Sequence, residues 1–148
     1  MDKNKKIIGI TCSTFDLLHA GHIIMLEECK KYCDYLICAL QVDPTLDRPE
    51  KNKPIQSLIE RYLQLDAVQY VDKIIPYSTE EELKTLFSSL DLDIRIIGEE
   101  YKDENFTGKD ICLKRGIKLV YNKRDHNFST TSLRERIYKQ EYSKRFVK

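Results

Sequence analysis

The chain has 148 residues, of which 41% are hydrophobic and 33% are charged. This is the usual size of one domain, and the apolar share is large enough to bury a core, so we expect a single domain over residues 1–148. The 25 basic and 24 acidic residues leave a net charge of +1. General nucleic-acid and membrane binders carry a basic excess, so this balance argues against both, while a local basic pocket for phosphates remains compatible with it.

The sequence predicts a cytoplasmic location. Its N-terminus is polar and leads directly into a short apolar run, without a signal-peptide pattern, and no stretch approaches the roughly 18 apolar residues of a membrane span. The number of cysteines is odd and no CxxC pair occurs, which favours reduced, mostly buried thiols in a reducing compartment. The five are Cys12, Cys29, Cys33, Cys38 and Cys112.

Apolar runs and helical patterns alternate in the first half of the chain. Ile7–Cys12 predicts a buried strand, Gly21–Tyr32 a helix, and Tyr35–Val42 a second strand that is apolar on both faces. Such two-sided strands are typical of a parallel sheet with helices on both sides. The polar segment Asp43–Gln56, which contains three prolines, predicts a mobile loop.

The alternation continues to the C-terminus. Ser57 predicts the N-cap of a helix that ends at about Gln69, and overlapping capping boxes in Ser78–Glu82 predict a helix to about Leu90. The other predicted elements are strands at Lys73–Pro76, at Asp93–Ile97 before Gly98 and at Lys118–Tyr121, a helix at Lys109–Arg115 that Gly116 terminates, and a helix at Thr131–Lys139. This order predicts the α/β class: a single doubly wound, Rossmann-like domain with a five-stranded parallel sheet.

The turn after the first strand carries a candidate phosphate site. Ligands of open α/β sheets bind at the carboxyl ends of the strands. Two of the three histidines of the chain, His19 and His22, lie here on either side of Gly21. Their spacing of three places both imidazoles on one side of a first helical turn, whose free N–H groups attract anions. The turn therefore predicts a cradle for a polyphosphate. A zinc site would need a third ligand, and none is local.

Two segments resemble a known family. Residues 13–22 (STFDLLHAGH) resemble the G-T-F-D-x-x-H-x-G-H signature of the cytidylyltransferase-like nucleotidyltransferases. Residues 124–131 (RDHNFSTT) resemble the R-T-x-G-I-S-T-T element of the branch that uses CTP. Chain length and motif order are most similar to the glycerol-3-phosphate cytidylyltransferases. The resemblance implies transfer of CMP from CTP to a small phosphorylated alcohol, with glycerol 3-phosphate as the first candidate, giving CDP-glycerol and pyrophosphate. It also implies Mg²⁺ held mainly by the nucleotide phosphates, no protein metal site, and a homodimer.

The resemblance also implies the residues that contact CTP. His19 and His22 would stabilise the transition state at the α-phosphorus, and Arg124 would neutralise the β- and γ-phosphates. Lys51 or Lys53 would close over the triphosphate from the loop. Of the two, Lys53 is expected to be catalytic, together with His19, His22 and Arg124. The other expected nucleotide contacts are Thr14, Phe15, Gly21, Lys51, Gly98, Glu100, Ser129, Thr130 and Thr131.

The acceptor site is expected at Asp16, Arg61, Tyr101 and His126. Two of these have alternatives: Asp16 either orients the first motif or satisfies backbone donors in the turn, and His126 is either an acceptor contact or a surface residue. The segment from Tyr101 to residue 108 is either a lid over the acceptor or a plain polar loop.

Several departures from the family pattern leave the substrate open. Ser13 replaces a glycine, Phe128 an isoleucine, and Gln69 an arginine that glycerol-3-phosphate enzymes tend to have. Residues 125–127 also differ from T-x-G. The acceptor is therefore glycerol 3-phosphate or another polyol, sugar or aminoalcohol phosphate. An adenylyltransferase and a nucleotide-binding module without chemistry are the alternative functions.

Overall fold

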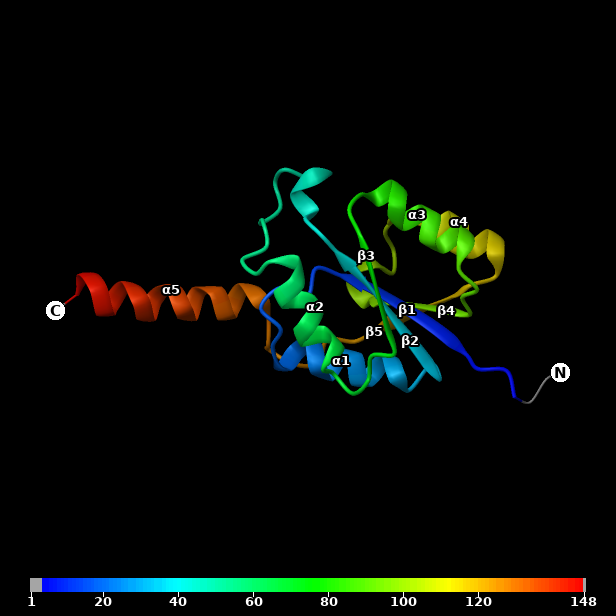
Figure 1. Cartoon of the computed structure of the whole chain (residues 1–148), viewed down its shortest axis with the longest axis horizontal. Coiled ribbons are helices and arrows are strands. Elements are labelled where there is room, and N and C mark those ends of the chain that lie inside the picture. Colours follow the sequence, from blue (N-terminus) through cyan, green and yellow to red (C-terminus); the bar gives the residue numbers. More distant parts are fainter. Residues whose placement is uncertain (1–3, 148) are drawn as a thin grey trace.

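The computed structural model describes residues 4–147, in which five parallel strands form one sheet in the order β3-β2-β1-β4-β5 (Figure 1). The strands are β1 (Ile8–Ser13), β2 (Tyr35–Gln41), β3 (Lys73–Tyr77), β4 (Ile94–Gly98) and β5 (Lys118–Asn122). The α/β class and the five-stranded parallel sheet predicted from the sequence are confirmed. The direction of winding reverses between β1 and β4, and such a switch point is where open α/β sheets bind ligands.

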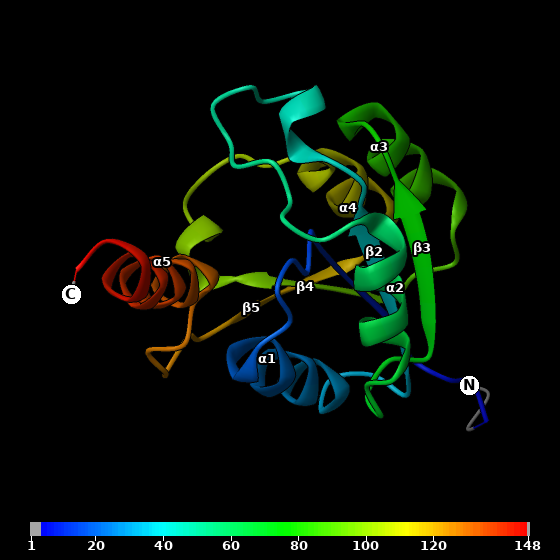
Figure 2. The same ribbon diagram turned by 60° about the vertical axis from the view of Figure 1, so that its left-hand side comes forward.

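Helices cover both faces of this sheet. Figure 2 shows α1 and α2 on one face, and α3 and α4 on the other. The helices are α1 (Ala20–Lys30), α2 (Leu58–Asp66), α3 (Glu80–Ser89), α4 (Lys109–Arg115) and α5 (Thr130–Phe146), with short 3₁₀ turns η1 (Pro44–Leu46) and η2 (Glu99–Tyr101). Within the described residues, no helix has both the length and the apolarity to cross a membrane.

The two-sided apolar pattern of β2 arises because both of its faces are buried. Leu36 and Leu40 belong to the core under α1 and α2, whereas Ile37 and Ala39 belong to the core under α3 and α4. Alternate side chains of a strand point to opposite faces, so a central strand between two helical layers has no polar face. All five cysteines are free thiols, in line with the sequence analysis.

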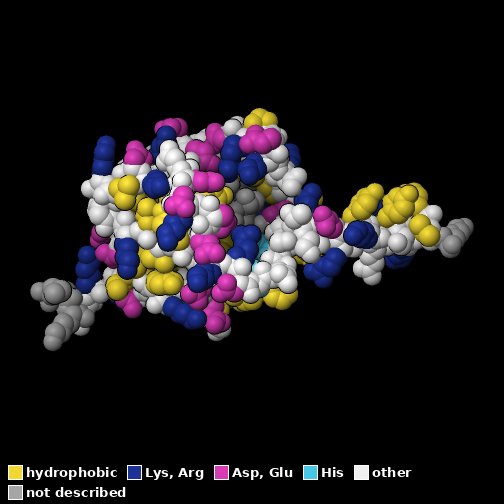
Figure 3. All heavy atoms as spheres, turned by 180° about the vertical axis from the view of Figure 1, so that it is seen from behind, with side chains coloured by type: hydrophobic (Ala, Val, Ile, Leu, Met, Phe, Trp, Pro, Cys, Tyr) yellow, Lys and Arg dark blue, Asp and Glu magenta, His cyan; other side chains and the backbone are white. Residues whose placement is uncertain are grey.

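The last helix is longer than predicted. It covers Thr130–Phe146 rather than Thr131–Lys139, and none of its residues is buried. Figure 1 shows it projecting from the domain, and Figure 3 shows hydrophobic side chains gathered toward its far end. The extension was missed because residues 140–146 are mostly polar or charged and none of them is buried, so no core-facing pattern marks them.

The segment 43–56, predicted as a mobile loop, is ordered within itself and bonded to α3. Asp43 caps η1 inside the segment through a 2.9 Å bond from the backbone N–H of Thr45. Asp47 accepts a 2.7 Å bond from the backbone N–H of Glu80 at the start of α3. These bonds hold the loop over the carboxyl ends of β1, β2 and β3.

Candidate functional site

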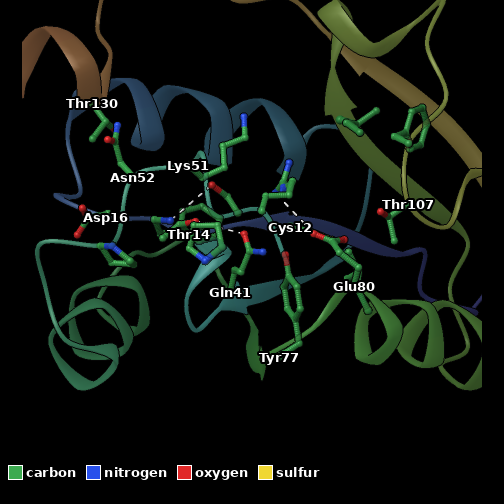
Figure 4. A pocket seen from close by; sticks show the side chains of 18 of the residues that line it. Cys12, Thr14, Asp16, Gln41, Lys51, Asn52, Tyr77, Glu80, Thr107 and Thr130 are labelled. Carbon is green, nitrogen blue, oxygen red and sulfur yellow. Dashed lines mark hydrogen bonds and ion pairs between the residues drawn. The ribbon is translucent and has the colours of Figure 1, made fainter. Parts of the chain in front are cut away.

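Two adjoining cavities open at the switch point of the sheet. The loop cavity, about 580 Å³, lies beneath the 43–56 loop, and the histidine cavity, about 740 Å³, lies beside α1 and the start of α5 (Figure 4 shows the loop cavity). Both are lined by Cys12, Ser13, His22, Arg95, Ile97, Tyr101, Thr130 and Thr131. The shared lining means that ligands in the two cavities would meet at these residues.

His19 joins the two motifs of the site. Its Nδ1 accepts a 3.0 Å hydrogen bond from the backbone N–H of Gly21, so it forms the N-cap of α1. A ring that accepts at Nδ1 carries its proton on Nε2 when neutral. Nε2 lies 3.1 Å from the hydroxyl oxygen of Thr130, 111 positions away in the chain. Burial lowers the pKa of His19, and the charges of His126 and Arg124 lower it further.

His22 faces the site in the same neutral form. Its Nδ1 accepts a 3.1 Å hydrogen bond from the backbone N–H of His19, which leaves Nε2–H as the outward donor. Burial, followed by the charges of His19 and Arg124, lowers the pKa of His22 to about 4. The two ring centroids are 3.9 Å apart. The pair therefore offers two preorganised, uncharged N–H donors, which suit oxygen atoms that gain negative charge during a reaction.

The start of α5 completes the cradle. Ser129 is its N-cap and accepts a 3.0 Å hydrogen bond from the backbone N–H of Ser132. Thr130 and Thr131 line both cavities, as expected for residues that contact phosphates. Two helix starts from opposite ends of the chain thus meet at one site, and Figure 3 shows histidine side chains in a hollow beside the second of them.

The histidine cavity also gathers residues from the ends of β4 and β5. Arg124 lies 3.8 Å from the carboxylate of Glu100, and both side chains are more than half exposed. That carboxylate folds back over Gly98, where a side chain would collide with it. Gly21 has the same function on the other side, because a Cβ atom there would lie 2.8 Å from the rings of His19 and His126.

His126 is half-buried, so it is not the surface residue of the second alternative. It lines the histidine cavity with His19 and Gly21. It does not line the loop cavity. All three histidines of the chain therefore gather around one glycine. Tyr101, by contrast, lines both cavities, so it lies where the two ligands would meet.

Arg61 was expected to bind the acceptor, but the structure places it outside both cavities. The residue is 2% exposed and lines neither cavity. It donates to four backbone carbonyls, those of Thr14 at 3.0 Å, Gln41 at 2.6 Å, Val42 at 2.7 Å and Gln56 at 3.1 Å. Arg61 therefore joins the first motif, the end of β2 and the loop, and almost no donor remains for a ligand.

Asp16 also has a structural role. One carboxylate oxygen accepts from the backbone N–H of Ile55 and the other from that of Gln56, both at 2.9 Å. Asp16 thus satisfies backbone donors, as in the second alternative, and it also lines the loop cavity. Those donors come from the far end of the 43–56 loop, so Asp16 fixes this loop to the first motif.

Phe15 is a buried residue that packs against His22 at the base of the loop cavity. The residue is 1% exposed, and its ring centroid lies 5.7 Å from that of His22. It lines the base of the loop cavity, but little of its ring can be reached by a nucleotide. Both Phe15 and Leu17 have a φ of 51°, a left-handed conformation that is rare for bulky side chains. Backbone strain of this kind clusters at functional sites.

The structure distinguishes the two loop lysines. Lys51 lines the loop cavity together with Thr14, whereas Lys53 lines neither cavity. Gln69, which replaces a family arginine, is exposed and also lines neither cavity. Of the two lysines predicted to contact the triphosphate, Lys51 therefore lies at the site. Lys53 lines neither cavity in this arrangement of the loop.

Sequence reasoning missed four residues of the loop cavity: Gln41, Arg48, Tyr77 and Arg95. Arg95 could have been found, because a charged residue in the middle of the apolar strand β4 is unusual. The segment after Tyr101 forms a wall of the cavity, since Asn105, Phe106 and Thr107 line it. This location fits the lid alternative better than the plain loop.

The carboxylates at the site are already bonded within the protein. Asp16 accepts from two backbone N–H groups, Glu80 pairs with Arg48 at 3.5 Å, and Glu100 lies near Arg124. Among the described residues, no three His, Cys, Asp or Glu side chains are arranged to hold a metal ion.

Comparison with known proteins identifies the family of this chain. Residues 10–136 match the model of the cytidylyltransferase-like family. The chain belongs to this family. The cytidylyltransferase-like chain is 35% identical to the glycerol-3-phosphate cytidylyltransferase of Bacillus subtilis, over 90% of this chain and 97% of that one. It is 31% identical to the Staphylococcus aureus protein of the same name, over 87% and 93%.

Other similar proteins carry different names. The cytidylyltransferase-like chain is 34% identical to the bifunctional protein HldE of Campylobacter jejuni, over 93% of this chain but 29% of that protein. Among solved structures, a lipopolysaccharide core biosynthesis protein from Thermoplasma volcanium superposes with a TM-score of 0.64 at 26% identity, over 84% of this chain and all of that one. Membership of the family thus supports nucleotidyl transfer as the reaction class. The names of the similar proteins do not agree on one acceptor.

Proposed function

We propose that this protein transfers CMP from CTP to a small phosphorylated alcohol and releases pyrophosphate. The observation that carries the proposal is the convergence of His19, His22 and Thr130 at the meeting point of two cavities. One cavity would hold the nucleotide and the other the acceptor, so the reacting groups would meet at these residues. Proximity of this kind supplies a large part of the rate of a two-substrate reaction.

The reaction proceeds by in-line attack. An oxygen of the acceptor phosphate forms a bond to the α-phosphorus of CTP, the bond from this phosphorus to the bridging oxygen breaks, and pyrophosphate carries away the electron pair. The acceptor phosphate is ionised at neutral pH, so no protein base is needed. The Nε2–H groups of His19 and His22 donate to the oxygens that gain charge.

Cationic side chains assist the departure of pyrophosphate. Arg124 borders the histidine cavity, which would hold the nucleotide, and Lys51 would approach the triphosphate from the loop where the two cavities meet. Mg²⁺ brought with CTP would neutralise part of the charge of the phosphates. Together these groups stabilise the leaving pyrophosphate more than the bound substrate, which is the requirement for catalysis.

CTP is the preferred donor in this proposal. The R-D-H-N-F-S-T-T segment supports it, and Glu100 at the end of β4 offers a carboxylate that can accept from the cytosine amino group. Pyrophosphate release with CTP and with ATP, in the presence of a panel of phosphorylated alcohols, tests this choice. Turnover with ATP alone would make the protein an adenylyltransferase, and nucleotide binding without turnover would make it a binding module.

Glycerol 3-phosphate is the reference acceptor, because it is named in the relatives from Bacillus subtilis and Staphylococcus aureus. The panel also includes sugar and aminoalcohol phosphates, since HldE proteins match at a similar identity. We further propose that the protein is a homodimer, by analogy with the family. Sedimentation equilibrium at micromolar concentration would return the mass of a monomer if that analogy fails.

A further inference from the structure

The loop cavity contains buried donors that have no acceptor. Among the buried side-chain nitrogen and oxygen atoms of the described residues, those without a hydrogen-bond partner are Gln41 Nε2, Arg48 Nε and Arg95 Nε. All three belong to side chains that line the loop cavity. Buried polar groups are nearly always paired in folded proteins, and each exception calls for an explanation. A ligand that supplies oxygen atoms would explain three such donors in one place.

Arg95 is the strongest of these observations. Only 4% of the residue is exposed, and its guanidinium lies between the rings of Phe87 at 4.2 Å and Phe106 at 4.8 Å. Its Nη1 donates to the carbonyl of Thr107 at 2.5 Å, but no described carboxylate forms an ion pair with it. The two rings offset part of the cost of burying this charge, but the Nε donor has no partner, so its position favours a function in binding an oxygen-rich group.

Gln41 is fixed in orientation by its other end. Its Oε1 accepts a 3.4 Å hydrogen bond from the hydroxyl of Thr14, which directs the amide nitrogen elsewhere. The residue is 4% exposed, and Figure 4 shows both Gln41 and Tyr77 directed into the cavity. Tyr77 is also buried, and burial raises the pKa of its hydroxyl, which therefore stays protonated at neutral pH.

The third donor belongs to an ion pair at the rim. Arg48 comes from the 43–56 loop, is half-exposed, and lies 3.5 Å from the carboxylate of Glu80. The cavity thus combines N–H donors with a carboxylate that can accept. Hydroxyl groups both donate and accept, so they suit such a lining. An ammonium group does not, because Arg48, Lys51, Arg95 and Arg134 line the same cavity.

We infer, on the basis of the proposed function, that the loop cavity binds the end of the acceptor that lies away from its phosphate, and that Gln41 and Arg95 select a polyhydroxylated acceptor longer than glycerol 3-phosphate. The cavity of about 580 Å³ is within the range that holds drug-sized ligands, more than a three-carbon chain requires. Polyol and sugar phosphates of five or more carbons are the substrate class that fits.

The first test compares acceptors with the wild-type protein. We expect kcat/KM for ribitol 5-phosphate or sorbitol 6-phosphate, with CTP as donor, to exceed that for glycerol 3-phosphate by at least about tenfold, because a site built to bond substrate hydroxyls discriminates against an acceptor that lacks them. A higher kcat/KM for glycerol 3-phosphate than for all longer acceptors would overturn the inference.

The second test removes one donor. Gln41→Met keeps the length of the side chain but not its amide, and we expect a loss of about tenfold in kcat/KM for the longer acceptor, with less than a threefold change for glycerol 3-phosphate and for CTP. Arg95→Lys is the second variant, and the exposed Gln64→Met is the matched control. Circular dichroism confirms folding. Equal losses for both acceptors, or none, would contradict the inference.

Calorimetry separates this inference from the proposed function. If no acceptor yields pyrophosphate with either nucleotide, the proposed function fails. Titration of ribitol 5-phosphate into the wild-type protein and into Gln41→Met still tests the cavity, because it measures binding without turnover. We expect at least tenfold weaker binding to the variant. Equal affinity, or no binding to either protein, would show that the loop cavity does not select a polyhydroxylated end.

Discussion

The Nε2 atom of His19 lies 3.1 Å from the hydroxyl of Thr130, and this contact joins the two ends of the chain into one site. Each residue stands at the start of a helix, where free N–H groups attract anions. A phosphate that displaces or bridges this contact would be held from both sides. The catalytic proposal depends on this geometry, and its first test is at the histidines.

Replacing either imidazole is expected to slow the reaction without unfolding the protein. His19→Ala and His22→Ala should each lower kcat by about two to three orders of magnitude, as the loss of a transition-state donor does. Pyrophosphate release under saturating CTP measures the effect, with Gln64→Ala as a control at an exposed position. A kcat within threefold of the wild-type value would remove the histidines from the mechanism.

The two loop lysines provide a matched pair. Lys51 lines the loop cavity and Lys53 does not, so Lys51→Ala should lower kcat/KM for CTP by about tenfold, as expected for loss of a charge-assisted contact, while Lys53→Ala should change it by less than threefold. Steady-state kinetics with CTP as the varied substrate distinguishes them. The reverse order would mean that the loop rearranges when the nucleotide binds.

Arg61 is expected to matter for stability rather than for acceptor binding. Arg61→Met leaves four buried carbonyls without their donor, and bonds to charged groups contribute about 1.5–3 kcal/mol each, so the free energy of unfolding should fall by about 3 kcal/mol or more. Urea denaturation measures this, with the exposed Arg136→Met as the control. A stable variant whose acceptor KM rises would restore Arg61 to the acceptor site.

The lowered pKa of His22 predicts a pH dependence of stability. In the unfolded chain a histidine titrates near 6.5, whereas His22 in the folded protein titrates at about 4. As the pH falls from 6.5 to 4, the unfolded chain binds a proton that the folded chain does not. The contribution of His22 to the free energy of unfolding is therefore complete above pH 6.5 and decreases toward pH 4, by at most about 1.4 kcal/mol per pH unit. Urea denaturation at pH 7, 6 and 5 should show that the free energy of unfolding decreases less in His22→Gln than in the wild-type protein. Parallel curves would mean that His22 is not held neutral.

The outer half of α5 is expected to be dispensable for the stability of the sheet domain. No residue of α5 is buried, and Tyr142 and Phe146 contact one another with ring centroids 5.1 Å apart. Removing residues 140–148 should therefore shift the melting temperature by no more than about 2 °C, as surface changes do. Differential scanning calorimetry checks this. A larger decrease would reveal that another part of the protein, or a second copy, packs on the helix.

Several features followed from the sequence because their physical signals are local. The strand β2 is apolar at every position that the two helical layers bury, and Gly116 closes α4 with a φ of 73°, as the pattern predicted. His19, Gly21 and His22 are close in sequence, so the spacing alone placed them on one turn of α1. The family motif then supplied the partner segment at Ser129–Thr131, which spacing could not locate.

Two arginines show what only the tertiary structure decided. Arg61 and Arg95 are both buried, at 2% and 4% exposure, yet the first is bonded to four carbonyls and the second retains an unpaired Nε. The function of a guanidinium depends on which acceptors lie within about 3 Å of it. Those acceptors come from residues as far as 47 positions away, and the fold alone brings them together.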